Sequence, residues 1–167
     1  MDIKTILFPT DFSDSDHAAL EYASRLASES GALLYIVHTD DMERIAAAMS
    51  DAGHPYPSPW DDKGRRKAHV KLRKVVPTVT GVKFRHRYLD GTPTAQIVSF
   101  AERKGVDLIV MGSHGRSGIA RVLMGSTAEG VMRRAPCPVL IVKQPTEEKM
   151  NEEQEHSRAS AASRHVK

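Results

Sequence analysis

Three glycines and a pair of hydroxyl residues have the types and spacing to hold a phosphate group. Gly112 and Gly115 follow an apolar run, and Gly125 stands further along, directly before Ser126 and Thr127. Glycine permits backbone conformations that expose amides, and Gly125 leaves room for a ligand at the start of the next helix. Amides at a helix N-terminus, together with the two hydroxyls, would form a phosphate cradle.

Two further side chains of this connection could donate to the same ligand. They are His114 and Arg116, and Arg116 also adds positive charge. The loop is not a P-loop, and no Gly-x-Gly-x-x-Gly follows the first apolar run, so dinucleotide binding is not supported either. The lone cysteine, Cys137, excludes an intrachain disulfide and a multi-cysteine zinc site. The sequence has no dedicated metal site, so magnesium would come with a phosphate ligand, close to the carboxylate of Asp11.

Short apolar runs alternate with helical patterns along the chain. Runs that are apolar on both faces are typical of buried parallel strands, and a run that alternates with Arg85 and Arg87 is typical of a strand near a sheet edge. We expect strands at 3–8, 32–37, 82–89, 106–111 and 138–143, and helices at 13–30, 41–49, 62–76, 92–104 and 126–134. This order predicts an α/β fold, a doubly wound five-stranded parallel sheet with helices on both faces, of the Rossmann-like kind.

Such a sheet binds ligands at the carboxyl ends of its strands, where the strand order reverses. In this chain the rule selects Pro9, Thr10 and Asp11 after the first strand, and the segment that begins at Gly112 after the fourth. His38 ends the second strand, and we expect it to be a buried histidine with a satisfied hydrogen bond.

Residue pairs near two predicted helix starts have the spacing of N-terminal caps. Ser13 with Asp16, and Ser126 with Glu129, could satisfy amides of a first helical turn. Gly105 suits the left-handed position that ends a helix. These signals place the start of the last helix at Ser126.

Composition predicts one soluble domain followed by a polar tail. Residues 1–145 have the usual size of a single domain, whereas 146–167 lack apolar periodicity and aromatic residues, which is typical of disorder. The longest unbroken apolar run, Val139–Val142, is far shorter than the ~20 residues of a membrane span, and the amino terminus does not read as a signal peptide. We therefore expect a cytoplasmic protein that does not engage a membrane.

The glycine pattern also belongs to a longer set of markers. Gly112, Gly115, Gly125 and Ser126 fit a Gly-x₂-Gly-x₉-Gly-[Ser/Thr] signature, with Ile-Leu-Phe-Pro-Thr-Asp-Phe-Ser at 6–13 and Pro-Cys-Pro-Val-Leu-Ile-Val at 136–142. In this order the markers resemble the ATP-binding members of the universal stress protein family, over nearly all of residues 1–144. The resemblance implies an adenine nucleotide alpha hydrolase-like fold and a homodimer formed through the last strand.

The resemblance also implies roles for individual residues. The aspartate at position 11 would lie near the nucleotide, the residue at position 39 would contact the base, and the glycines with their hydroxyl neighbours would hold ribose and phosphates. With His114 and Arg116 from the loop, the expected ATP site comprises Pro9, Thr10, Asp11, Thr39, Met111, Gly112, His114, Gly115, Arg116, Gly125, Ser126 and Thr127.

These observations favour a nucleotide-dependent regulatory module in stress response, because the phosphate cradle comes without an obvious catalytic base. A slow ATPase or phosphotransferase that recruits Asp11, His114 and Arg116 is one alternative. The other is a nucleotide-independent interaction protein that uses the basic helix 62–76 for an anionic partner. No aromatic residues interleave those cations, so we do not expect nucleic acid to be that partner. The helix and the proline-rich insert 53–60 depart from the family's pattern.

Overall fold

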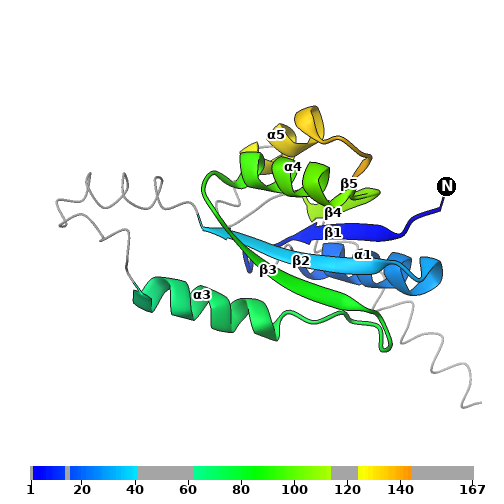
Figure 1. Ribbon diagram of the computed structural model, residues 1–167, viewed down its shortest axis with the longest axis horizontal. Coiled ribbons are helices and arrows are strands. Elements are labelled where there is room, and N and C mark those ends of the chain that lie inside the picture. Colours follow the sequence, from blue (N-terminus) through cyan, green and yellow to red (C-terminus); the bar gives the residue numbers. More distant parts are fainter. Residues whose placement is uncertain (1, 14–15, 41–61, 114–123, 144–167) are drawn as a thin grey trace, which may run out of the picture.

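The structure, a computed structural model, describes residues 2–13, 16–40, 62–113 and 124–143 (Figure 1). The predicted helix at 41–49, the insert 53–60 and the tail 146–167 lie outside the described residues. Strands and helices alternate in the order β1 Thr5–Pro9, α1 Asp16–Ser30, β2 Leu33–Asp40, α3 Asp62–Lys74, β3 Phe84–Asp90, α4 Pro93–Lys104, β4 Leu108–Gly112, α5 Ser126–Arg134 and β5 Val139–Val142.

The strands form one parallel sheet in the order β3-β2-β1-β4-β5. The chain builds outward from β1 to β3 and then returns to the other side of β1, so the order reverses between β1 and β4. Figure 1 shows α1 and α3 on one face of the sheet and α4 and α5 on the other. The predicted doubly wound, five-stranded parallel fold is confirmed, with β3 at one edge as its alternating arginines indicated.

A hydrophobic core lies on each face of the sheet, and the central strand β1 contributes side chains to both. Ile6 and Phe8 pack beneath α1, whereas Leu7 packs beneath α4 and α5, because successive side chains of a strand point to opposite faces. All three are fully buried. Burial of this apolar surface, at about 25 cal/mol per Å², is what fixes the strand register and the positions of the strand ends.

The helix ends follow the sequence signals in part. Gly105 ends α4 with φ 58°, in the left-handed conformation that glycine adopts without steric cost. The prediction that Ser126 caps α5 is wrong: Gly125 occupies the cap position with an extended backbone, and no side chain caps the helix. The cap falls one residue early because the Gly125 amide donates to the Ser113 carbonyl at 2.8 Å, which fixes where the chain enters the helix. Glu129 pairs instead with Arg133 on the surface.

Within the described part of the chain, no helix combines the length and the apolar character that a membrane crossing requires.

Candidate functional site

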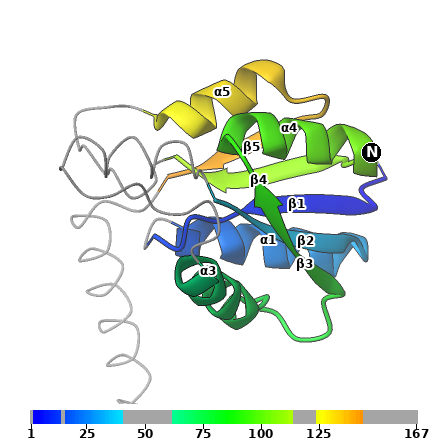
Figure 2. The same ribbon diagram turned by 60° about the vertical axis from the view of Figure 1, so that its left-hand side comes forward.

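The carboxyl ends of β1 and β4 lie side by side where the strand order reverses. Backbone hydrogen bonds continue past the strands there: Thr10 N donates to Val37 O at 2.8 Å, and Ser113 N donates to Val142 O at 3.0 Å. Figure 2 shows that α5 starts at this same side of the domain. This edge of the sheet therefore brings together two segments that are about a hundred residues apart in sequence.

The start of α5 has backbone N–H groups that find no acceptor inside the helix. Glu129 N donates to Gly125 O at 3.0 Å as the first bond of the helix. The amides of Ser126, Thr127 and Ala128 precede that bond and so have no acceptor inside the helix. Ser126 is exposed and Thr127 half-buried, so two hydroxyls accompany these amides. Unsatisfied amides and the helix dipole together attract an anion.

The turn between β1 and α1 is organised by one carboxylate. Asp16 Oδ2 accepts hydrogen bonds from the Thr10 hydroxyl at 2.5 Å, from Asp11 N at 3.0 Å and from Phe12 N at 3.1 Å. Phe12 adopts φ 64°, a left-handed backbone that is costly for a residue with a Cβ. The three bonds to Asp16 hold the turn in this conformation.

Burial changes the acidity of that carboxylate. The pKa of Asp16 is raised to about 6, chiefly because the carboxylate is removed from water; the charge of Asp11 adds to the rise, and the hydrogen bonds from Thr10, Asp11 and Phe12 oppose it. Asp16 is thus a proton-binding group directly beneath the candidate site. The sequence predicted it as a cap residue and did not identify this role.

Asp11 belongs to the same turn between β1 and α1. Its Oδ1 accepts a hydrogen bond from Ser13 N at 3.0 Å, which closes a local Asx-type turn. The side chain is half-buried at the carboxyl edge of the sheet. This placement fits a carboxylate that borders a ligand.

The end of β2 contributes a buried histidine and a half-buried threonine. His38 Nδ1 lies 2.7 Å from Thr10 O, which confirms the expectation of a buried histidine with a satisfied hydrogen bond. Its ring is 4.2 Å from that of Phe12, so it also packs beneath the turn. Thr39 pairs in register with Leu89 and is half-buried at the strand end. Because it alternates with His38, Thr39 is on the sheet face that α4 and α5 cover.

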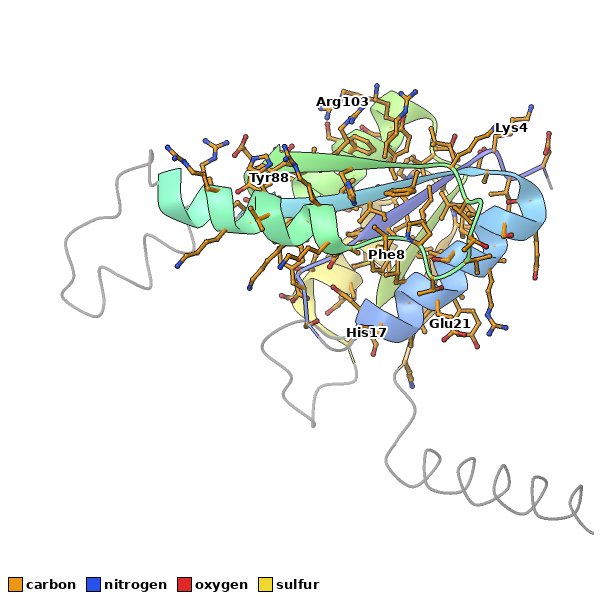
Figure 3. All side chains as sticks on the ribbon, turned by 90° about the horizontal axis from the view of Figure 1, so that it is seen from below. Lys4, Phe8, His17, Glu21, Tyr88 and Arg103 are labelled. Atoms are coloured by element: carbon orange, nitrogen blue, oxygen red, sulfur yellow. The ribbon has the colours of Figure 1, made fainter. Side chains whose placement is uncertain are left out.

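A tyrosine contact that the sequence did not signal fixes the next strand end. The Tyr88 hydroxyl of β3 donates to Asp40 Oδ2 of β2 at 2.6 Å. The His69 ring of α3 stacks on the Tyr88 ring, with the ring centroids 4.1 Å apart. Figure 3 shows the labelled Tyr88 beside α3. Burial raises the pKa of Tyr88, so this phenol stays protonated and donates. The contact ties α3 to the edge of the sheet near the site.

The predicted site residues that the structure describes all lie at the carboxyl edge. They come from four elements or their ends: Pro9, Thr10, Asp11, Thr39, Met111, Gly112, Gly125, Ser126 and Thr127. Met111 is buried in the core beneath α4 and α5. His114, Gly115 and Arg116 lie outside the described residues.

Metal chemistry has little basis in the described region. Among those residues no group of three or more His, Cys, Asp or Glu side chains could hold a metal ion. Cys137 is half-buried against the core, and burial raises the pKa of its thiol, so it behaves as a small packed side chain.

Fold and site together define a doubly wound α/β domain whose anion-binding features lie at its topological switch point. The model of the universal stress protein family matches residues 2–143. A universal stress protein of Methanocaldococcus jannaschii is 37% identical over 145 residues, covering 87% of this chain and 85% of the relative. The chain belongs to the universal stress protein family.

Solved structures agree with this assignment. One, of a second M. jannaschii universal stress protein, superposes with a TM-score of 0.74 and 30% identity, covering 88% of this chain and all of that one. Another, a universal stress protein in complex with cAMP, superposes with a TM-score of 0.54 and 28% identity, covering 85% of this chain and 98% of that one.

Proposed function

We propose that this protein binds ATP, with its accompanying magnesium ion, in the crevice between β1, β4 and the start of α5, as a nucleotide-dependent regulatory module. The observation that carries the proposal is the set of three open amides and two hydroxyls at the start of α5. The cAMP bound by a family member supports an adenine nucleotide as the ligand class. The Gly112–Gly115–Gly125–Ser126 signature supports a longer phosphate chain.

Each side of the crevice has a separate task in this proposal. The amides of Ser126, Thr127 and Ala128 bind phosphate oxygens, and the helix dipole favours their negative charge. The turn held by Asp16, with Thr39 at the end of β2, borders the adenosine. Asp11 lies where a water ligand of the magnesium ion could be accepted, because Mg²⁺ keeps several waters when it binds with a nucleotide.

Binding would act by population shift. A ligand that contacts both β1–α1 and α5 stabilises the arrangement in which these segments are in place, and it changes the population of any surface coupled to them. No step of turnover is required for this effect.

The experiment is a calorimetric titration with Mg·ATP of the wild-type protein and of Ser126→Asp. The added carboxylate would stand where a phosphate is expected to bind, so we expect affinity to fall by about tenfold or more. An acidic residue in the first turn also favours the helix, so the variant should fold.

The matched control is Ser99→Asp on α4. It introduces the same charge at a serine that accepts a hydrogen bond from Arg103 one turn later, a contact that aspartate retains. Affinity of this control should equal that of the wild type. Absence of saturable binding at millimolar Mg·ATP by folded protein would refute the proposal, and equal binding by Ser126→Asp would place the nucleotide elsewhere.

We further propose a homodimer through β5. This strand lies at the sheet edge opposite β3, and its Leu140 is 36% exposed. Sedimentation of the wild type should give the dimer mass, and Leu140→Glu should give the monomer. A wild-type monomer at all concentrations would contradict this arrangement.

A further inference from the structure

The edge strand β3 has an outer row of backbone groups to which no further strand is paired in the described region. Its ladder to β2 begins where Leu34 N donates to Lys83 O at 2.9 Å and ends where Gly91 N donates to Asp40 O at 3.1 Å. In a parallel ladder every second residue of a strand faces the same neighbour. The backbones of Arg85, Arg87 and Leu89 therefore face β2.

The backbones of the alternate residues, Phe84, His86 and Tyr88, face outward. The outward direction of the His86 carbonyl agrees with its hydrogen bond: it accepts from Arg87 Nη1 at 2.8 Å and not from a backbone amide of β2. Figures 1 and 2 show β3 at the margin of the sheet, with α3 on one face of it. An exposed row of this kind is a template for a further strand.

Cations border this row on the α4 face of the sheet. Arg85 and Arg87 are exposed and two residues apart, so both are on that face. The Arg87 guanidinium lies 5.9 Å above the ring of Tyr35, a member of the core beneath α4.

The α3 face contributes a cation as well. His69 contacts Tyr88 of β3, whereas Lys71 lies 5.8 Å from the Phe12 ring at the other side of the helix. Arg73 stands one turn after His69 and is exposed, so it is on the side of α3 that faces β3. Positive charge thus flanks the edge from both faces of the sheet.

From this arrangement we propose that β3 is a docking edge for an extended acidic segment of another protein, which adds to the sheet as a sixth strand. Such a segment would place carboxylates at every second position, about 6.6 Å apart, which is the spacing of Arg85 and Arg87 along a strand. Its backbone would pair with Phe84, His86 and Tyr88.

In the free protein, the Arg87 side chain occupies the place beside the His86 carbonyl that the added strand would take. Its guanidinium bonds the outward His86 carbonyl, which an N–H group of an added strand would also use. When the strand binds, that N–H replaces the guanidinium at the carbonyl, and the guanidinium pairs with a carboxylate. The exchange leaves each donor with an acceptor.

Other polyanions and a second copy of this chain fit the edge less well. Phosphate groups of a nucleic acid have no N–H donors for the outward carbonyls of β3. A second β3 would bring Arg85 and Arg87 close to the same arginines, and like charges on paired strands repel.

The test is fluorescence anisotropy with a blocked, labelled nonapeptide in which glutamate alternates with threonine, added to the full chain. Saturable binding is expected, and Arg85→Glu/Arg87→Glu should weaken it by about tenfold or more, because both ion pairs reverse sign. Arg133→Glu is the matched control and should bind as the wild type does, because Arg133 is an exposed arginine on α5, which packs against β5 at the opposite edge of the sheet.

A second arm tests the backbone pairing. Two peptide analogues, one N-methylated on its glutamates and one on its threonines, block opposite edges of the peptide, so one should lose binding and the other keep it. Phe84→Pro removes one outward N–H at the first residue of an edge strand, where proline is tolerated, and should also weaken binding.

Several results would overturn the assignment. Equal binding of both methylated analogues, or of a peptide with its glutamates contiguous, would show general attraction to positive charge. Tighter binding of a duplex DNA probe that Arg85→Glu/Arg87→Glu abolishes would make nucleic acid the partner. Wild-type self-association lost in the same variant would make a second copy the occupant. The affinity for the peptide could also rise tenfold when five glutamates of the chain are changed to glutamine: Glu147, Glu148, Glu152, Glu153 and Glu155. That result would make the chain's own acidic segment the occupant of the edge.

Discussion

The two sides of the candidate nucleotide site satisfy their backbone amides in opposite ways. In the β1–α1 turn, the amides of Asp11 and Phe12 already bond a carboxylate of the protein, that of Asp16. At the start of α5, the amides of Ser126 and Thr127 precede the first helical bond, and no side chain caps them. The amides of the β1–α1 turn thus bind a carboxylate of the protein itself, whereas those at the start of α5 are placed to bind an anion from a ligand.

The β1–α1 turn therefore contributes the shape of the site, whereas the start of α5 contributes the attraction for negative charge. An internal carboxylate lets the turn keep a left-handed Phe12 whether or not a ligand is present, so the turn is a preformed wall. Among the residues that the structure describes, no carboxylate caps the start of α5, so this side gains most from a bound phosphate. We therefore expect changes at Asp16 to affect folding first, and changes at the start of α5 to affect binding first.

The largest effect should come from Asp16→Ala. The change removes the acceptor of the Thr10 hydroxyl and of the Asp11 amide, and it leaves the Phe12 amide with Thr10 Oγ1 alone, so we expect the free energy of unfolding to fall by about 3 kcal/mol. Urea denaturation followed by circular dichroism measures it. Glu21→Ala, which removes an exposed carboxylate from the same helix, should cost less than about 0.5 kcal/mol. Equal costs for the two variants would remove Asp16 from its organising role.

A smaller effect should appear in the pH dependence of stability. The folded protein raises the pKa of Asp16 to about 6 through burial, so it binds this proton more tightly than the unfolded chain does. The resulting stabilisation is present at low pH and is lost as pH rises from about 4 through about 6. Asp16→Asn cannot ionise, and its amide oxygen can still accept from Asp11 and Phe12.

The measurement is the difference in unfolding free energy between wild type and Asp16→Asn at pH 4.5 and pH 7. The wild type should lose about 1–2 kcal/mol relative to the variant over this interval. Taking the difference cancels the other titrating groups. A difference that stays constant, or that changes in the opposite sense, would show that hydrogen bonding outweighs burial at this carboxylate.

The smallest effect concerns the position of α5. A Cβ added at Gly130 would lie 2.9 Å from both Cγ2 and Oγ1 of Thr94 on α4. Thr94 is buried and β-branched, so it cannot readily move away. Gly130→Ala should therefore lower stability by about 1 kcal/mol despite the better helix propensity of alanine. It should also weaken ATP binding, because α5 shifts relative to β4.

Gly64→Ala supplies the matched control for this substitution. Gly64 is an exposed glycine inside α3, where the same change should raise stability by about 0.5–1 kcal/mol. Thermal unfolding of both variants, with Mg·ATP titrations, gives the comparison. Stabilisation of both would show that α4 and α5 are not tightly packed at Gly130.

Much of the fold could be predicted because its strands are apolar on both faces. Ile6, Leu7 and Phe8 are consecutive apolar residues, a pattern typical of a strand covered on both faces, and the helix breaks at glycines indicated the order of elements. The alternating Arg85 and Arg87 likewise placed β3 at an edge. For the site, the rule that ligands bind where the strand order reverses predicted Asp11 and Gly112 from the sequence alone.

What the sequence did not predict depends on contacts between distant segments. The Tyr88–Asp40 bond follows from the register of two parallel strands, which no local pattern encodes. The cap of α5 moved to Gly125 because Ser113 accepts that residue's amide. Asp16 fits a local capping pattern, but its bonds to Asp11 and Phe12 depend on the left-handed backbone of Phe12.

The strand order also governs when the crevice can exist during synthesis of the chain. β1 is synthesised about a hundred residues before β4, its neighbour on one side. Until then the nascent domain has β2 on one side of β1 and an open, apolar edge on the other, a state that chaperones recognise and that aggregates readily. The nucleotide site is completed only when β4 and α5 close that edge, so no ligand held between them can assist the early steps of folding.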